Sequence, residues 1–134
     1  MFVELVEPGG SQRRRRYHSS LTLAESELLI LHVAAHYRCV GEQQIHEPIA
    51  QQTGLSDEVL AAIRANAPPP LGTARQRLLA EVANELLTTK KLSAALYERA
   101  VRELGERTLI EVVGILGYYA LVAYTLNAFE MRLE

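Results

Sequence analysis

Apolar residues recur three and four positions apart along most of the chain, which is the spacing of one face of an α-helix. Together with the turn residues, this pattern predicts six helices over about 22–39, 42–52, 56–67, 73–89, 93–105 and 108–129. No segment shows the alternation of a β-strand, and no repeat or low-complexity tract interrupts the helical pattern. We therefore expect an all-α protein with short connections between its helices.

Short polar residues mark where the predicted helices begin. Two helices open with the Thr-x-x-Glu spacing of a capping box, in which each side chain bonds the backbone of the other residue. These pairs are Thr22 with Glu25 and Thr108 with Glu111. Two more helices open with a serine that can act as the N-cap, at Ser56 and Ser93. Gly41 predicts a break between the first helix and the second.

The last predicted helix has no charged side chain from Val112 to Phe129, and this length meets the simplest criterion for a membrane span. Tyrosines, Thr125 and Asn127 dilute the segment and no second such segment exists, so we expect no membrane contact. A helix that is apolar all round is normally buried, and a 134-residue chain offers few neighbours to cover it. We therefore expect a homo-oligomer whose subunits bury this helix.

Residues 1–21 show little periodicity and contain the only basic block, Arg13–Arg16. We interpret them as a solvated N-terminal arm that precedes one domain over residues 22–134. The formal charge of −2 argues against nucleic acid as a partner. The single cysteine cannot form an internal disulfide, and no signal-peptide pattern is present, so we expect a cytoplasmic protein.

One stretch of the chain points to chemistry. Glu42 and His46 are four residues apart, so on a helix the carboxylate can orient the imidazole and favour its charged form. Such a pair can transfer protons. Cys39 stands near the predicted start of the same helix, where backbone N–H groups favour a thiolate. The alternative is that Cys39 is a small buried apolar residue and that the pair lies on a solvated helix face.

A second group of residues has the spacing of metal ligands. His32, His36 and Cys39 follow one another at intervals of four and three residues, so they share one stripe of a helix. A stripe of this kind can bind zinc or copper if a fourth ligand completes the site. The alternative is that both histidines simply border the core.

The order of residues from Glu27 to Ser56 resembles the carboxymuconolactone decarboxylase family, which includes alkyl hydroperoxidase D. The residues that carry the resemblance are Glu27, Cys39, Glu42, His46, the run 47–50 and the run 54–56. The runs 117–120 and 126–129 also resemble the C-terminal helix of that family, so the resemblance covers about residues 22–129. It implies an alkyl hydroperoxidase D-like helical fold, a trimer or hexamer, and neither a cofactor nor a metal.

In the hydroperoxidase branch of that family, a glutamate on one helix precedes a Cys-x-x-Cys pair and a histidine. Glu27, Cys39 and His46 fall on this pattern, but Glu42 stands where the second cysteine belongs. A thiolate that attacks a peroxide becomes a sulfenic acid and needs another thiol to resolve it. Peroxidase activity of a peroxiredoxin type would therefore need an external thiol or the Cys39 of another subunit.

In the decarboxylase branch, the family carries Glu-x-x-x-His, which Glu42 and His46 match. Loss of carbon dioxide from a carboxylated lactone leaves an enolate-like carbon that must be protonated, and a positioned histidine suits this step. The resemblance therefore implies His46 as the proton-transfer group, Glu42 as its orienting carboxylate and Glu27 as a second relay carboxylate. Cys39 is the candidate thiol nucleophile of the peroxidase alternative.

Two departures from the family concern the surroundings of this site. Ser26 precedes Glu27 where family members usually have an arginine, and the short arm replaces helices that usually lie upstream. We favour an enzyme acting on a small lactone or carboxylated ring acid over a single-cysteine hydroperoxidase. The third alternative is a non-catalytic oligomeric helical protein.

Overall fold

The computed structural model describes residues 19–134, so the Arg13–Arg16 block and most of the predicted arm lie outside the described residues. This part of the chain contains six helices and no strand, which confirms the all-α class. The helices are α2 (Leu23–His36), α3 (Val40–Gln52), α4 (Asp57–Arg64), α5 (Ala74–Thr89), α6 (Ala94–Leu104) and α7 (Glu106–Ala128).

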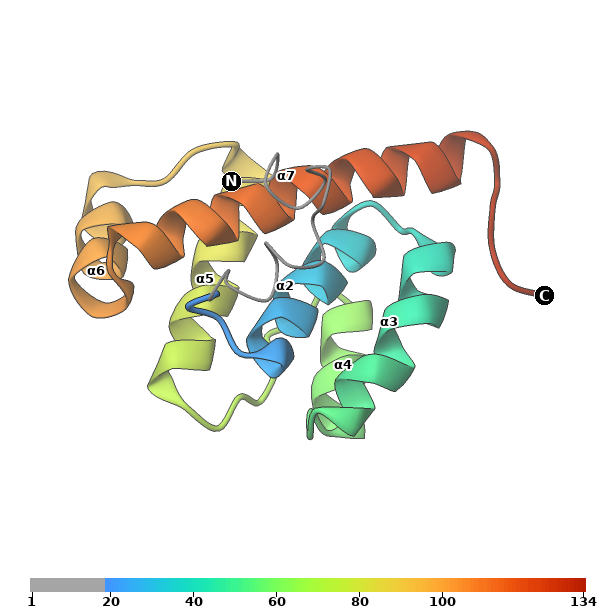
Figure 1. The fold of residues 1–134 in the computed structure, drawn as a ribbon, viewed down its shortest axis with the longest axis horizontal. Helices are drawn as coiled ribbons and strands as arrows, with labels where there is room; N and C mark the ends of the chain where they lie inside the picture. The colour runs from blue at the N-terminus through green and yellow to red at the C-terminus, as the bar shows by residue number, and fades with distance from the viewer. Residues whose placement is uncertain (1–18) are drawn as a thin grey trace, which may run out of the picture.

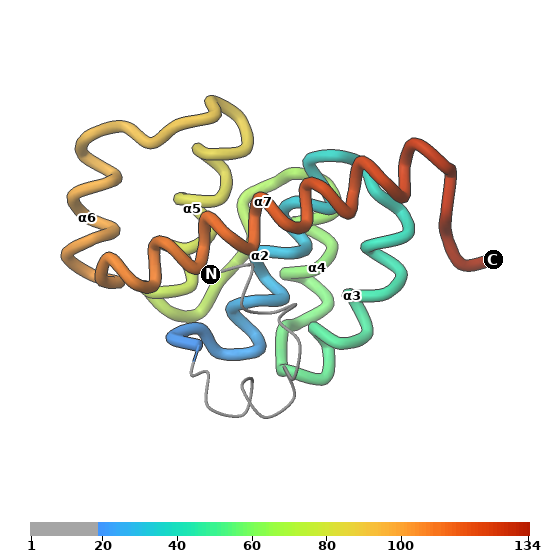
Figure 2. Tube along the Cα trace, turned by 45° about the horizontal axis from the view of Figure 1, so that its top comes forward, coloured from blue at the N-terminus to red at the C-terminus, as the bar shows by residue number. Residues whose placement is uncertain are grey.

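Helix α2 lies at the centre of the molecule and packs against α3, α4, α5 and α7. It separates two apolar clusters, because opposite sides of the helix carry apolar residues. Leu29 and Val33 pack with residues of α5, α6 and α7, whereas Leu28 and Leu31 pack with residues of α3 and α4. Figures 1 and 2 show α7 running the length of the molecule, from α6 at one end to α3 at the other. A polar residue on α2 can therefore be buried, because other helices cover both sides of α2.

The local capping signals place most helix starts correctly. The capping box at the start of α2 is formed, because Thr22 Oγ1 accepts from the N–H of Glu25 at 3.1 Å and Glu25 Oε1 accepts from the N–H of Thr22 at 2.9 Å. Three further helices begin after an N-cap whose side-chain oxygen accepts a backbone N–H. These N-caps are Ser56, Thr73 and Ser93.

The predicted break at Gly41 is wrong, because α2 ends at His36 and α3 already begins at Val40. The joint is Tyr37 to Cys39, where Arg38 adopts a left-handed conformation with φ of 52° and Cys39 is the N-cap of α3. Gly41 lies inside α3 for a packing reason. A Cβ atom there would come within 2.6 Å of the backbone oxygen of Met131. The glycine therefore admits the C-terminal segment rather than ending a helix.

The second predicted capping box is also wrong, because α7 begins at Glu106 and has no side-chain cap. Thr108 Oγ1 instead donates to Ser20 Oγ at 2.8 Å. Glu111 accepts hydrogen bonds from Ser19 Oγ and from the backbone N–H of Ser20, both at 2.9 Å. The two residues that have the spacing of a local cap are thus engaged by partners about ninety positions earlier in the chain.

Helix α7 is only partly covered within one chain. It is the one helix in the described part that is long and apolar enough to cross a membrane by length and composition, and 28% of its most apolar window is buried. Its large apolar side chains that are at least half exposed are Ile110, Val113, Leu121 and Tyr124. The burial of this helix by other subunits stays a prediction.

Candidate active site

Three ionisable side chains from α2 and α3 meet in the interior of the protein. Glu27 projects from α2, and Glu42 and His46 project from consecutive turns of α3. Nδ1 of His46 lies 2.7 Å from Oε1 of Glu27, and Nε2 of His46 lies 3.8 Å from Oε2 of Glu42. Glu27 is 4% exposed and Glu42 is 3% exposed. The two carboxylates therefore address opposite nitrogens of one imidazole.

The positions of these residues follow from the local fold. Glu27 directly precedes the apolar run Leu28–Leu31 of α2, so folding buries its carboxylate unless the side chain leaves the core. Glu42 lies in the first turn of α3, where unbonded N–H groups favour a negative charge. His46 stands one turn later and faces α2. Because a buried charge needs a partner, the imidazole between the two carboxylates makes their burial tolerable.

The carboxylates favour the charged form of His46. Burial by itself lowers the pKa of His46, but the hydrogen bond to Glu27 and the negative charges of Glu27 and Glu42 outweigh burial and raise the pKa above its ordinary value. A protonated imidazole carries a proton on each nitrogen. With Nδ1 bound to Glu27, the Nε2–H points toward Glu42 as the available acid.

Glu42 is the residue of the site that has an oxygen without a hydrogen bond. Its Oε2 is buried and is the one such side-chain oxygen or nitrogen without a hydrogen-bond partner among the described residues. Burial raises the pKa of Glu42, the charge of His46 opposes this shift, and the charge of Glu27 adds to it. A buried acceptor without a hydrogen bond lowers the stability of the fold by about 1–3 kcal/mol. Its presence therefore calls for an explanation other than stability.

Cys39 is the N-cap residue of α3 and is fully buried, with 0% of its surface exposed. Burial raises the pKa of the thiol, and the charge of Glu42 adds to the shift. Hydrogen bonds from the backbone N–H groups of Glu42 and Gly41 act in the opposite direction. The balance favours the neutral thiol, which is a poor nucleophile.

Tyr119 of α7 completes one side of the site, and sequence reasoning did not find it. Its ring meets the imidazole of His46 edge to face, with centroids 5.5 Å apart and planes at 87°. Burial and the charges of Glu42 and Glu27 raise the pKa of Tyr119, so its phenol stays protonated. The available signal was a polar ring within the uncharged part of the last helix.

The geometry changes one role expected from the sequence and does not support one alternative. The spacing of four predicts that Glu42 orients His46, but the closer carboxylate is Glu27, nineteen positions earlier. The histidine stripe does not form a metal site either. His32 Nδ1 bonds the backbone oxygen of Leu28 at 2.7 Å, and no group of three His, Cys, Asp or Glu residues in the described part is arranged to hold a metal ion.

The sequence profile of the Carboxymuconolactone decarboxylase family matches residues 11–85, which is more than half of the chain. A similar solved structure is that of an uncharacterized peroxidase-related protein from Silicibacter sp. TM1040, with a TM-score of 0.72 and 20% sequence identity. The likeness covers 85% of this chain and 61% of that chain. No curated protein matches the sequence. The alkyl hydroperoxidase D-like helical fold is thereby confirmed.

Proposed function

The chain belongs to the carboxymuconolactone decarboxylase family, and on that premise we propose that it decarboxylates a small lactone or carboxylated ring acid by proton transfer. One observation carries the proposal. The Nε2 atom of His46, whose charged form the carboxylates favour, lies 3.8 Å from the Oε2 atom of Glu42, which has no hydrogen-bond partner. These are an acid and an acceptor placed at one point and engaged by no other described group, which is the arrangement that general acid–base catalysis requires.

The proposed reaction consumes one proton. The bond between the ring carbon and its carboxylate breaks, carbon dioxide leaves, and the electron pair stays on the ring carbon as an enolate-like system. His46 then gives its Nε2 proton to that carbon, while Glu27 keeps the Nδ1 proton and fixes the ring. Glu42 then passes a new proton to Nε2, and this proton enters the carboxyl group at Oε1 because Oε2 is buried. The role suits a carboxyl group whose pKa is raised.

Exposure supports approach of a substrate from the His46 side. The His46 side chain is 13% exposed, whereas the side chains of both glutamates are 5% exposed and Cys39 is fully buried. A substrate therefore meets the imidazole first. Tyr119 stands edge-on to that ring and limits how it can turn.

The test is carbon dioxide release from a panel of carboxylated lactones and ring acids. His46→Ala should lower turnover by about a hundredfold or more, the usual effect of removing a general acid. Cys39→Ser should leave turnover within about twofold, since the thiol has no step in this reaction. Glu47→Gln is the matched control, because Glu47 lies on the same helix but pairs with Arg64 at the surface. In D₂O, the product should carry deuterium at the carbon that lost carbon dioxide.

The opposite pattern would reject this reaction. If Cys39→Ser abolished turnover and His46→Ala did not, proton transfer by His46 would not be the chemistry of the site. If no compound of the panel released carbon dioxide and no peroxide were consumed, the non-catalytic alternative would replace both.

A second candidate rests on the place of Cys39 at the N-terminus of α3, where two backbone N–H groups bond the sulfur. As a peroxidase, the Cys39 thiolate would attack a hydroperoxide, the O–O bond would break, and an alcohol would leave. The sulfenic acid would be reduced by an external dithiol to give water and a disulfide. Cys39→Ser should then abolish peroxide consumption in the presence of dithiothreitol, and unchanged consumption would exclude this candidate.

We also propose that the protein forms a trimer or hexamer through the exposed apolar face of α7. Ile110 and Val113 are 52% and 50% exposed, and Leu121 is 59% exposed, which is unfavourable in water. Leu121→Glu should shift the sedimentation coefficient toward that of a monomer, whereas Glu98→Gln on α6 should not change it. A monomeric wild-type protein would contradict the proposal. The cytoplasmic location also stays a proposal, which rests on a single cysteine that cannot form an internal disulfide.

A further inference from the structure

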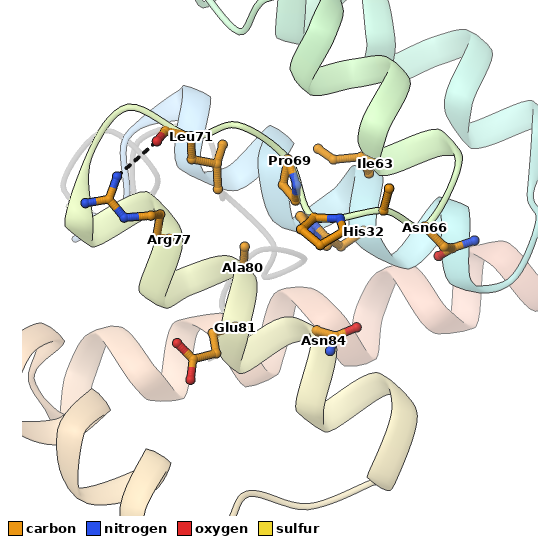
Figure 3. Close-up of a pocket in the computed structure, with 11 residues that line it drawn as sticks. His32, Ile63, Asn66, Pro69, Leu71, Arg77, Ala80, Glu81 and Asn84 are labelled. Atoms are coloured by element: carbon orange, nitrogen blue, oxygen red, sulfur yellow. Dashed lines mark hydrogen bonds between the residues drawn. The ribbon is translucent and has the colours of Figure 1, made fainter.

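A cavity of about 390 Å³ lies apart from the site just described, between α2, α5 and the segment that follows α4. Its size falls in the range of small-molecule sites. Its walls are mixed, with apolar surface and a few polar groups, and none of Glu27, Cys39, Glu42 and His46 lines it. Figure 3 shows the lining side chains used below: His32, Ile63, Asn66, Pro69 and Arg77.

The polar centre of this cavity is His32. Its Nδ1 lies 2.7 Å from the backbone oxygen of Leu28, and a carbonyl cannot donate, so Nδ1 carries the proton. Burial lowers the pKa of His32 and outweighs the backbone hydrogen bond that raises it, so the ring is neutral at pH 7. Nε2 therefore presents a lone pair. No described residue bonds this atom, and it is not sealed from solvent as Glu42 Oε2 is.

The lining of the cavity carries one cation, Arg77, and one carboxylate, Glu81. Arg77 donates from Nη1 to the backbone oxygen of Leu71 at 3.0 Å and has no carboxylate partner among the described residues. The one carboxylate that lines the cavity, Glu81, is already paired with Arg99. Arg77 and Asn66 mark opposite ends of the cavity in Figure 3, with His32 between them. A ligand that spans the cavity thus meets a cation at one end and an acceptor along its length.

We propose that this cavity is a second ligand site, which binds a small organic acid that carries a hydroxyl group. The hydroxyl donates to Nε2 of His32, the apolar body lies against Ile63 and Pro69, and the carboxylate lies near Arg77. A neutral imidazole with a fixed tautomer is an acceptor for a hydroxyl, and a guanidinium without a carboxylate partner favours a carboxylate. The site is independent of the proposed decarboxylation, because it shares no residue with it.

Three matched probes test the two polar contacts separately. They are 4-hydroxyphenylacetate, phenylacetate, which lacks the hydroxyl, and 2-(4-hydroxyphenyl)ethanol, which lacks the carboxylate. We expect 4-hydroxyphenylacetate to bind most tightly, phenylacetate to bind about three- to tenfold more weakly, and the alcohol about tenfold or more weakly. The ¹⁵N resonances of the histidine rings locate the ligand. The Nε2 signal of His32 should shift while Nδ1 stays protonated and the His46 signals stay unchanged.

Two substitutions at one position provide the control. His32→Asn can keep the hydrogen bond to Leu28 but removes the acceptor at Nε2, whereas His32→Gln can place an amide oxygen near the Nε2 position. The advantage of 4-hydroxyphenylacetate over phenylacetate should vanish in His32→Asn and persist in part in His32→Gln. Thermal unfolding shows whether both variants remain folded. No binding, equal affinity for the three probes, or shifts at His46 in place of His32 would overturn the proposal.

Discussion

Two clusters of buried glutamates flank α2, and they differ in how completely their oxygens are bonded. In the Glu25–Glu111 cluster, Glu25 binds Arg75 Nε at 2.7 Å and the N–H of Thr22 at 2.9 Å. Glu111 binds two hydrogen-bond donors at 2.9 Å, and Ser20 also donates its hydroxyl to it. In the Glu27–His46–Glu42 cluster, Oε2 of Glu42 has no hydrogen-bond partner and lies 3.8 Å from Nε2 of His46.

On the proposed function, the difference in bonding separates a structural role from a reactive one. Glu25 is 5% exposed and Glu111 is 5% exposed, so burial alone does not distinguish them from Glu27 and Glu42. Carboxylates whose oxygens are bonded hold distant parts of the chain together. On the proposed function, a carboxylate that is buried without full bonding is the one that exchanges a proton. Substitutions in the two clusters can test whether they divide in this way.

The largest expected contrast is in turnover. Glu42→Gln should lower decarboxylation by about a hundredfold, because the amide cannot carry a proton to His46. Glu111→Gln should leave turnover within about twofold once the variant is folded, because Glu111 touches no reacting group. The measurement is initial rate at saturating substrate for both variants. Equal losses in the two variants would erase the proposed division between the clusters.

Stability should show the reverse contrast. Glu111→Ala should lower the free energy of unfolding by about 2 kcal/mol, because it removes several hydrogen bonds to a charged group. Glu42→Gln should change it by less than about 1 kcal/mol, since Oε2 of Glu42 makes no hydrogen bond in the folded state. Urea unfolding measures both, with Glu98→Ala as the surface control. A larger loss for Glu42→Gln than for Glu111→Ala would contradict the comparison.

The Glu27–His46–Glu42 cluster should also make stability depend on pH. The folded pKa of His46 lies above 6.5, so the folded protein binds this proton more tightly than the unfolded chain. The stabilisation is full below about pH 6.5 and is lost as pH rises through the folded pKa. It amounts to about 1.4 kcal/mol for each tenfold gain in proton affinity on folding. Subtracting the pH profile of His46→Gln from that of wild type isolates this contribution, and a difference that grew with rising pH would have the wrong sign.

The smallest expected effect concerns the N-cap of α2, which belongs to the Glu25–Glu111 cluster. Thr22→Ala should lower the free energy of unfolding by about 1 kcal/mol, the usual cost of losing an N-cap, because Glu25 keeps its bond to Arg75. Ser56→Ala at the start of α4 is the matched substitution in a helix without a buried glutamate. A loss at Thr22 far above that at Ser56 would mean that the Glu25–Glu111 cluster unfolds as one unit.

The fold could be predicted where its determinants are local. Thr22 with Glu25, Ser56 and Ser93 act on the backbone within a few residues, so their sequence positions alone fix the helix starts. The predictions failed where a distant partner competes. Thr108 and Glu111 have the spacing of a capping box. Their side chains instead form hydrogen bonds with Ser20 and Ser19. Spacing along a helix says nothing about such partners.

The sequence could predict which residues form the candidate site, but it could not predict how they contact one another. The resemblance pointed to Glu27, Cys39, Glu42 and His46, and three of these meet. Which carboxylate bonds the imidazole depends on how α2 and α3 cross, and the sequence pattern holds no information on that angle. The edge-on ring of Tyr119 depends on the path of α7 and was missed for the same reason.

The left-handed backbone of Arg38 has a consequence for sequence drift at the joint between α2 and α3. A side chain with a branched Cβ is strained at a φ of 52°, whereas glycine and asparagine adopt it readily. In a saturation library, valine and isoleucine should therefore be depleted at this position while glycine and asparagine survive. The constraint falls on the shape of the backbone and not on the charge of Arg38, which is exposed. Relatives can change that charge without moving Cys39, the next residue.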